Sequence, residues 1–61
     1  MKSKNNLHEM DAKIQTLKKA AQELKDSSDD FPAVFRNCSR ILASIKMLEI
    51  NVSDLIQENR G

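Results

Sequence analysis

Few residues of this chain have the chemistry that catalysis or metal binding needs. It has one histidine, His8, and one cysteine, Cys38, whereas a structural zinc site takes about four such ligands. Because adjacent helical residues do not share a face, His8 and its neighbour Glu9 are poor joint ligands. We expect His8 to be a solvated surface residue and predict no metal site.

Nucleophilic catalysis has no better support. The serines Ser39, Ser44 and Ser53 lie in the second half of the chain, far in sequence from the histidine. Gly61 is the only glycine, so no glycine-rich loop is present to bind phosphate. The carboxylates fall mostly outside the apolar pattern, where water keeps their acidity ordinary. The sequence predicts a protein that is not an enzyme and uses no cofactor.

Apolar residues recur at alternating spacings of three and four over almost the whole chain. This pattern is typical of heptad positions a and d in helices that pack against one another. The first segment has Leu7, Ile14 and Ala21 at a and Met10, Leu17 and Leu24 at d, and the second has Phe31, Cys38, Ile45 and Val52 at a and Val34, Ile41, Leu48 and Leu55 at d. At a core a position, Cys38 is expected to behave as a small buried hydrophobe with an unreactive thiol.

The heptad frame slips between Ser28 and Pro32. If the first frame continued, Glu49 would fall in the core, so two helices with a turn between them are favoured. Proline is tolerated in the first turn of a helix but not in its interior. Serine and aspartate favour N-cap positions, which predicts Asp29 or Asp30 as the N-cap of the second helix.

The first helix has its own start signal. Asn6, with Glu9 three residues later, predicts a capping box there. We place the first helix near residues 5–26 and the second near residues 30–58. A connection this short makes neighbouring helices antiparallel. The predicted fold is therefore all-α, a single helical-hairpin domain over residues 1–61.

Two registers of the hairpin satisfy the apolar pattern. A tighter one suits an N-cap at Asp29, and a wider one shifts the second helix by two turns. The tighter register pairs Leu24 with Phe31 and Leu7 with Leu48, and the wider one pairs Leu24 with Cys38 and Leu7 with Leu55. The sequence leaves this choice open.

The second helix is apolar over a wider stripe than the first. Phe35, Leu42 and Ile56 occupy e positions beside its a and d residues. A two-helix hairpin cannot cover this stripe, and leaving it exposed would forgo several kcal/mol, at about 1.5 to 3 kcal/mol per large side chain. We expect a homodimer that forms a four-helix bundle, with an open choice between syn and anti topology. The expected dimer interface comprises Phe35, Cys38, Leu42, Ile45, Val52, Leu55 and Ile56.

A small apolar group lies on the opposite side of the second helix. Ala43, Met47 and Ile50 occupy f, c and f positions on successive turns. Such a patch is scattered surface hydrophobicity, a contact with a further copy, or a docking site for another protein, with Met47 as the adaptable contact. The sequence does not choose among these.

Charge gives limited support to nucleic-acid binding. Ten Lys and Arg residues against nine Asp and Glu give a formal net charge of +1, which is no polyanion-binding signature. On the first helix, however, Lys4, Lys18 and Lys25 share one edge, which dimerisation would double. These lysines are the candidate contacts of an alternative function as an RNA- or DNA-binding bundle.

The leading hypothesis is a non-catalytic protein-interaction module. It would self-associate through its helices and act as a small adaptor, regulator or assembly chaperone, with a protein partner that the sequence does not identify. The chain has no apolar run of about 18 residues, so the sequence predicts no membrane span. Its N-terminal residues do not resemble a secretory signal. Together with one buried thiol, this predicts a cytoplasmic protein.

Overall fold

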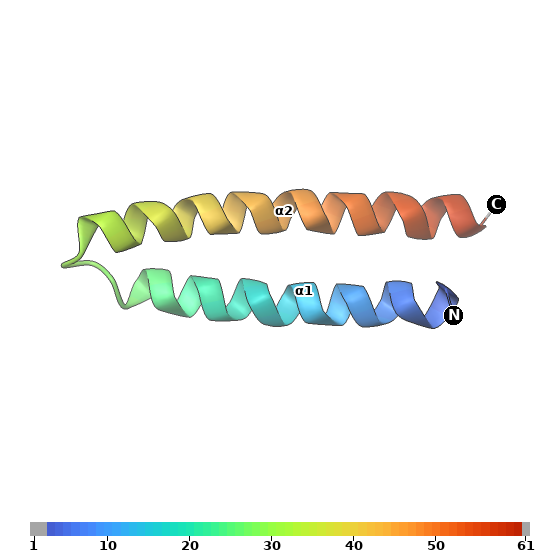
Figure 1. The fold of residues 1–61 in the computed structure, drawn as a ribbon, viewed down its shortest axis with the longest axis horizontal. Coiled ribbons are helices and arrows are strands. Elements are labelled where there is room, and N and C mark those ends of the chain that lie inside the picture. Colours follow the sequence, from blue (N-terminus) through green and yellow to red (C-terminus); the bar gives the residue numbers. More distant parts are fainter. Residues whose placement is uncertain (1–2, 61) are drawn as a thin grey trace.

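The fold consists of two helices packed side by side. The computed structural model describes the backbone of residues 3–60 and the side chains of residues 6–57. Helix α1 (Ser3–Asp26) and helix α2 (Pro32–Arg60) run antiparallel and are joined by residues 27–31 (Figure 1). The molecule measures 47 × 15 × 14 Å. The prediction of an all-helical antiparallel hairpin is confirmed.

Helix α1 begins earlier than the capping signal indicated. It starts at Ser3, so Asn6 lies inside the helix and the predicted capping box with Glu9 is wrong. A capping motif marks a helix start only where the preceding residues cannot be helical, and no proline or glycine precedes Asn6. The end of α1 at Asp26 agrees with the prediction, and α2 continues to Arg60 instead of ending near residue 58.

Helix α2 is capped by Phe31 and not by an aspartate. The Phe31 carbonyl accepts a 2.9 Å hydrogen bond from the Phe35 N–H, the first bond of α2. The prediction of Asp29 or Asp30 as N-cap is wrong because the Pro32 ring disfavours helical geometry at the residue before it. Pro32 therefore occupies the first helical position, where its missing N–H costs nothing.

Ser28 anchors the connection between the helices. Its side chain is only 2% exposed, and its hydroxyl donates a 2.8 Å hydrogen bond to the Lys25 carbonyl. Its N–H also bonds the Lys25 carbonyl, and its own carbonyl accepts the Phe31 N–H at 2.9 Å. Because these polar groups are all hydrogen-bonded, Ser28 can be buried. It occupies the a position that follows Ala21 in the heptad frame of α1.

The helices contact each other through a and e positions instead of a and d positions. The core comprises Ile14, Ala21, Ile45 and Val52, with Leu42 and Ile56 packed against it. Cys38, another a residue, is 1% exposed. At 100° per residue, position e lies about 40° to one side of a, and d about 60° to the other. The contact between the helices is displaced toward e, so the d residues lie outside it.

Polar contacts between the helices decide the register. The Glu49 carboxylate accepts hydrogen bonds from Gln15 at 2.8 Å and from Lys18 at 3.2 Å. In the tighter predicted register Glu49 would be level with Asn6, about 18 Å from Lys18 at 1.5 Å per residue. The structure therefore excludes the tighter register. The observed register differs from the wider predicted one by about one helical turn.

Candidate interaction surface

The most prominent functional feature is a set of large apolar side chains that neither helix covers. Each d residue has between 40% and 53% of its surface exposed. We call this set the d face, which comprises Met10, Leu17 and Leu24 of α1 and Val34, Ile41, Leu48 and Leu55 of α2. Phe31, at the loop end, is more exposed still.

The d residues of both helices lie on the same side of the hairpin. Two antiparallel helices are related by a two-fold axis perpendicular to the plane that contains them. This axis carries the d side of α1 onto the d side of α2 without moving it across the plane. The two apolar stripes therefore lie side by side on one surface, and the longer of them, from Val34 to Leu55, spans about 32 Å at 1.5 Å per residue.

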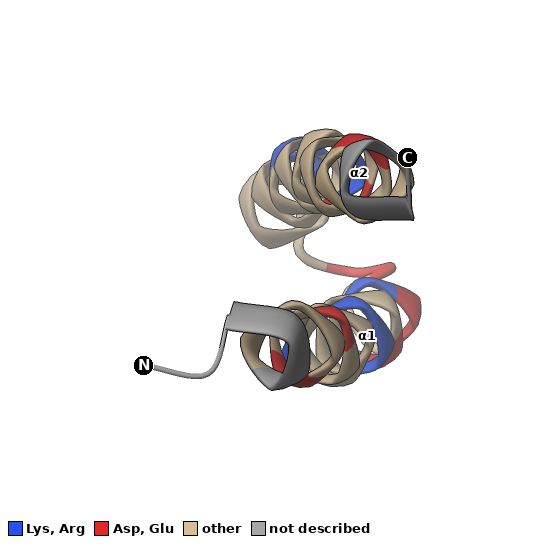
Figure 2. Ribbon diagram, turned by 90° about the vertical axis from the view of Figure 1, so that its right-hand side faces the viewer, with Lys and Arg blue, Asp and Glu red and all other residues tan. Residues whose placement is uncertain are grey.

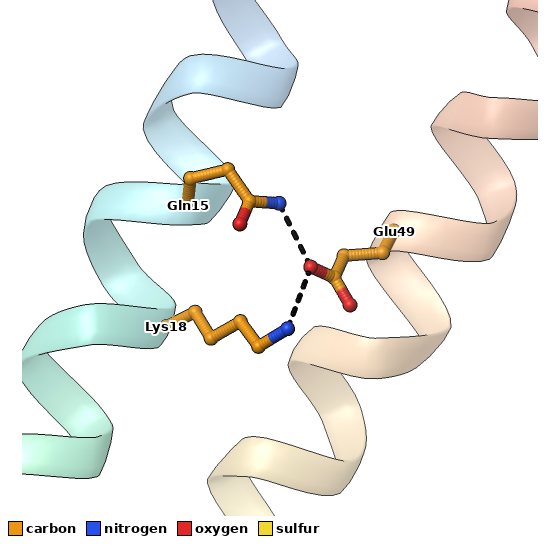
Figure 3. Close-up of polar contacts among 3 residues, drawn as sticks. All are labelled: Gln15, Lys18 and Glu49. Carbon is orange, nitrogen blue, oxygen red and sulfur yellow. Dashed lines mark hydrogen bonds and ion pairs between the residues drawn. The ribbon is translucent and has the colours of Figure 1, made fainter.

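The other edge of the helix contact is closed by polar side chains. Glu49 projects from α2 toward Gln15 and Lys18 of α1, and one of its carboxylate oxygens bonds both (Figure 3). Nearer the loop, the Lys25 ammonium group lies 5.1 Å from the centre of the Phe35 ring. On the e side, polar contacts within the chain therefore link the two helices. The d face on the other side of the contact remains about half-exposed.

These contacts also affect the acidity of Glu49. The hydrogen bond from Gln15 lowers the pKa of the Glu49 carboxyl below its ordinary value, and the bond and charge of Lys18 lower it further. The lowered pKa therefore extends the range over which Glu49 stays ionised and accepts both bonds to pH values below the ordinary 4.5.

The expected dimer-interface residues separate into two groups. Five of them face α1 of the same chain: Cys38, Ile45 and Val52 are buried there, and Leu42 and Ile56 are half-buried against that core. The other two, Phe35 and Leu55, remain exposed. Leu55 is the only d residue in the predicted interface, although the heptad pattern had identified the other six d residues as apolar as well.

Two of the three candidate nucleic-acid contacts, Lys18 and Lys25, contact α2 of the same chain. Lys18 is paired with Glu49, and half-buried Lys25 lies over Phe35. The side chain of Lys4 is outside the described residues. The lysines available for a polyanion are therefore partly engaged within the chain.

The second apolar patch remains separate from the d face. Ala43, Met47 and Ile50 are all exposed, with Met47 57% exposed. Positions c and f point away from the a and e contact, so this patch lies on the side of α2 remote from α1. It is smaller than the d face and belongs to α2 alone.

The described residues offer little material for a chemical site. His8 is exposed, and Cys38 is buried with a free thiol. Among the described side chains, those of residues 6–57, no cluster of three or more His, Cys, Asp or Glu could hold a metal ion. A surface hollow of about 600 Å³ lies beside the loop and is lined by Asp29, Pro32, Phe35, Arg36 and Ser39.

Comparison with known proteins adds no assignment. No family model, curated protein or solved structure matches this chain. Neither helix, over the residues described, has an apolar stretch long enough to cross a lipid bilayer. The class that the fold and surface define is a helical hairpin with one unpartnered apolar face.

Proposed function

We propose that this chain is a non-catalytic interaction module that self-associates through the d face into a four-helix bundle. In that form it would serve as a small adaptor, regulator or assembly chaperone. The observation that carries the proposal is the exposure of seven large apolar side chains on one side of the hairpin. Burying the exposed half of each is worth about 1 kcal/mol, which together approaches the stability of a whole small domain.

A second copy of the chain is the occupant that suits this surface. It presents an apolar face of the same length, so the two faces leave no apolar overhang. One side of the hairpin, about 47 Å by 15 Å, projects roughly 700 Å², close to the roughly 800 Å² that each partner contributes to a standard interface. The small core within one chain gives a further reason, since domains below about 70 residues need additional stabilisation.

Size-exclusion chromatography with light scattering tests self-association. We expect a mass twice the 6.9 kDa of one chain. Leu48→Asp should reduce this mass to that of a monomer, because it would place a charge in an apolar contact. Ile50→Asp is the matched control, since Leu48 and Ile50 are 42% and 44% exposed on different sides of the same helix.

The controls separate the two apolar surfaces. A dimer that survives Leu48→Asp but dissociates on Ile50→Asp would move the contact to Ala43, Met47 and Ile50. A well-folded monomer of the wild-type chain at low micromolar concentration would overturn the proposal. Circular dichroism of each variant would show whether the helices are retained.

The alternative of RNA or DNA binding receives less support. Lys18 and Lys25 are engaged with α2, and the formal net charge is only +1. Steeply salt-dependent retardation of RNA or duplex DNA at about 50 mM salt, weakened by Lys18→Glu, would favour it over protein interaction.

A further inference from the structure

The contact within one hairpin shows how the flanks of antiparallel helices pair. Lys18 and Glu49, which form the ion pair, both occupy e positions, and so do Lys25 and Phe35 of the cation–π contact. The e flank of one helix therefore meets the e flank of its antiparallel neighbour. Because e lies on the side of a that is remote from d, this flank belongs to the contact within the chain.

The other flank of each helix borders the d face. At 100° per residue, position g lies about 60° beyond d, on the side away from a. With the contact between the helices midway between a and e, d points about 10° and g about 50° from the perpendicular to the hairpin. The g residues are therefore the next to meet a chain that covers the d face.

We call the exposed g residues between Met10 and Leu55 the g border. They are Lys13, Ala20, Ser27, Asn37, Ser44 and Asn51. The first two belong to α1, Ser27 directly follows it, and the last three belong to α2. By analogy with the e flanks, the g border of one hairpin meets the g border of any copy whose helices run antiparallel to its own.

The g border carries little charge, since Lys13 is its only charged residue. Seen along the helices, charge gathers toward one side of the hairpin, where Figure 2 shows blue and red segments of α1 and a red loop on the right-hand side. The charged residues next to the g border occupy c positions, which point about 90° from the perpendicular and stay in water. These are Glu9, Glu23, Arg40 and Asp54.

This distribution of charge favours a second copy as the occupant of the d face. A partner with a charged flank would have to bury those charges against amide, hydroxyl and methyl groups, with no opposite charge to compensate them. A second copy brings the same nearly uncharged flank. The g border therefore matches itself.

Ser44 is the border residue that a second copy covers in either orientation. The d residues of α2 run from Val34 to Leu55, and Ser44 lies at their midpoint. With the loops at the same end, the levels fixed by the bonds of Glu49 place Ser44 within about 3 Å of the height of the partner's Ala20, at 1.5 Å per residue. With the loops at opposite ends, full coverage of the d residues places Ser44 beside the partner's Ser44.

We propose that the g border is the rim of the interface between two copies of this chain, with Ser44 at its centre. The proposal rests on the self-association proposed above and adds to it interface residues that lie outside the apolar pattern. It also makes the rim selective, because a partner is accepted only if its own flank carries little charge.

Thiol labelling tests the proposal. Ser44→Cys should react with N-ethylmaleimide at least about fivefold more slowly in the dimer than in the monomeric Leu48→Asp background, since a covered thiol reacts only when the contact opens. Ser53→Cys is the matched control, because Ser53 is another exposed serine of α2 and points away from the d face. Its rate should be the same in both backgrounds. Cys38 can be retained, since it is 1% exposed.

Two outcomes separate failure of the rim from failure of self-association. If light scattering shows a dimer but Ser44→Cys reacts equally fast in both backgrounds, the rim is wrong and self-association stands. If the wild-type chain is a monomer, both proposals are wrong.

Inserting a charge gives an independent check. Ser44→Glu should raise the Kd of the dimer at least about tenfold, because it buries a carboxylate beside uncharged groups. Ser53→Glu should leave the Kd within about twofold of the wild-type value, since its carboxylate stays in water. Circular dichroism would show that both variants keep their helices. Equal effects of the two substitutions on Kd would overturn the proposal.

Discussion

Glu49 is the residue that joins the two helices on their polar edge. It is half-buried, and its carboxylate accepts one bond from an amide and one from an ammonium group on α1. Neither bond could be anticipated from heptad positions, because the register was open. This residue therefore reports the register, and its ionisation makes the stability of the hairpin depend on pH.

The pH dependence follows from the lowered pKa of Glu49. Since the folded-state pKa is below the ordinary value of 4.5, ionised Glu49 stabilises the fold above that value. This stabilisation is lost as pH falls through the lowered pKa. Glu49→Gln should therefore lower Tm at pH 7, and the difference from wild type should be smaller at pH 3, below the ordinary pKa of 4.5. Circular dichroism melts at both pH values measure it.

The control for this prediction is Glu9→Gln, which removes an exposed carboxylate from α1. It should leave Tm at pH 7 close to the wild-type value. A Tm difference for Glu49→Gln that persists unchanged at pH 3 would mean that the carboxylate charge is not the stabilising group.

Cys38 makes a separate residue-scale prediction. Its side chain is 1% exposed in the contact between α1 and α2 of a single chain. A thiol reagent such as Ellman's reagent should react with it only as the hairpin opens, and quickly in about 6 M guanidinium. Because the burial comes from one chain, Leu48→Asp should leave Cys38 protected if the hairpin stays folded. Rapid stoichiometric reaction in the native state would contradict the register and core described above.

At the scale of the elements, the two apolar stripes of α2 have different roles. The a stripe holds α2 against α1, whereas the d stripe is available for another chain. Substitutions at Ile45 and Ile41 separate the roles, because both remove the same atoms from the same helix. Ile45 is 4% exposed and Ile41 is 47% exposed.

We expect Ile45→Ala to reduce the free energy of unfolding by about 2 to 4 kcal/mol, because it leaves a cavity in the core of the hairpin. Ile41→Ala should cost less than about 1 kcal/mol in the monomeric Leu48→Asp background, where its side chain remains in solvent. Urea denaturation of the two variants in that background measures both. Equal losses would show that the d residues are covered within one chain.

At the scale of the whole molecule, stability should depend on protein concentration. If folding and association are coupled through the d face, mass action raises Tm as concentration increases. We expect Tm to rise between about 1 and 100 μM for wild type and Ile50→Asp, and to stay constant for Leu48→Asp. A wild-type Tm independent of concentration would argue against a bundle formed by association of hairpins.

The sequence by itself determined the two helices, the turn between them and the identity of nearly every apolar position. These features follow from local rules, namely helical periodicity and the restriction that proline imposes on its neighbours. The start of α2 at Pro32 was also available from the sequence, because the same restriction excludes Phe31 from the helix. The prediction of an aspartate cap failed by giving residue preference more weight than that restriction.

Only the tertiary structure decided which side of the a stripe faces the other helix. Apolar residues flank it on both sides in α2, with Leu42 and Ile56 at e and Ile41 and Leu48 at d. A rotation of α2 by about 50° about its own axis would turn its d residues toward α1 in place of its e residues, and no local rule fixes that angle. The packing of Leu42 and Ile56 on the core and the bonding of Glu49 to α1 select e. That choice leaves the d face exposed and makes it the candidate interaction surface.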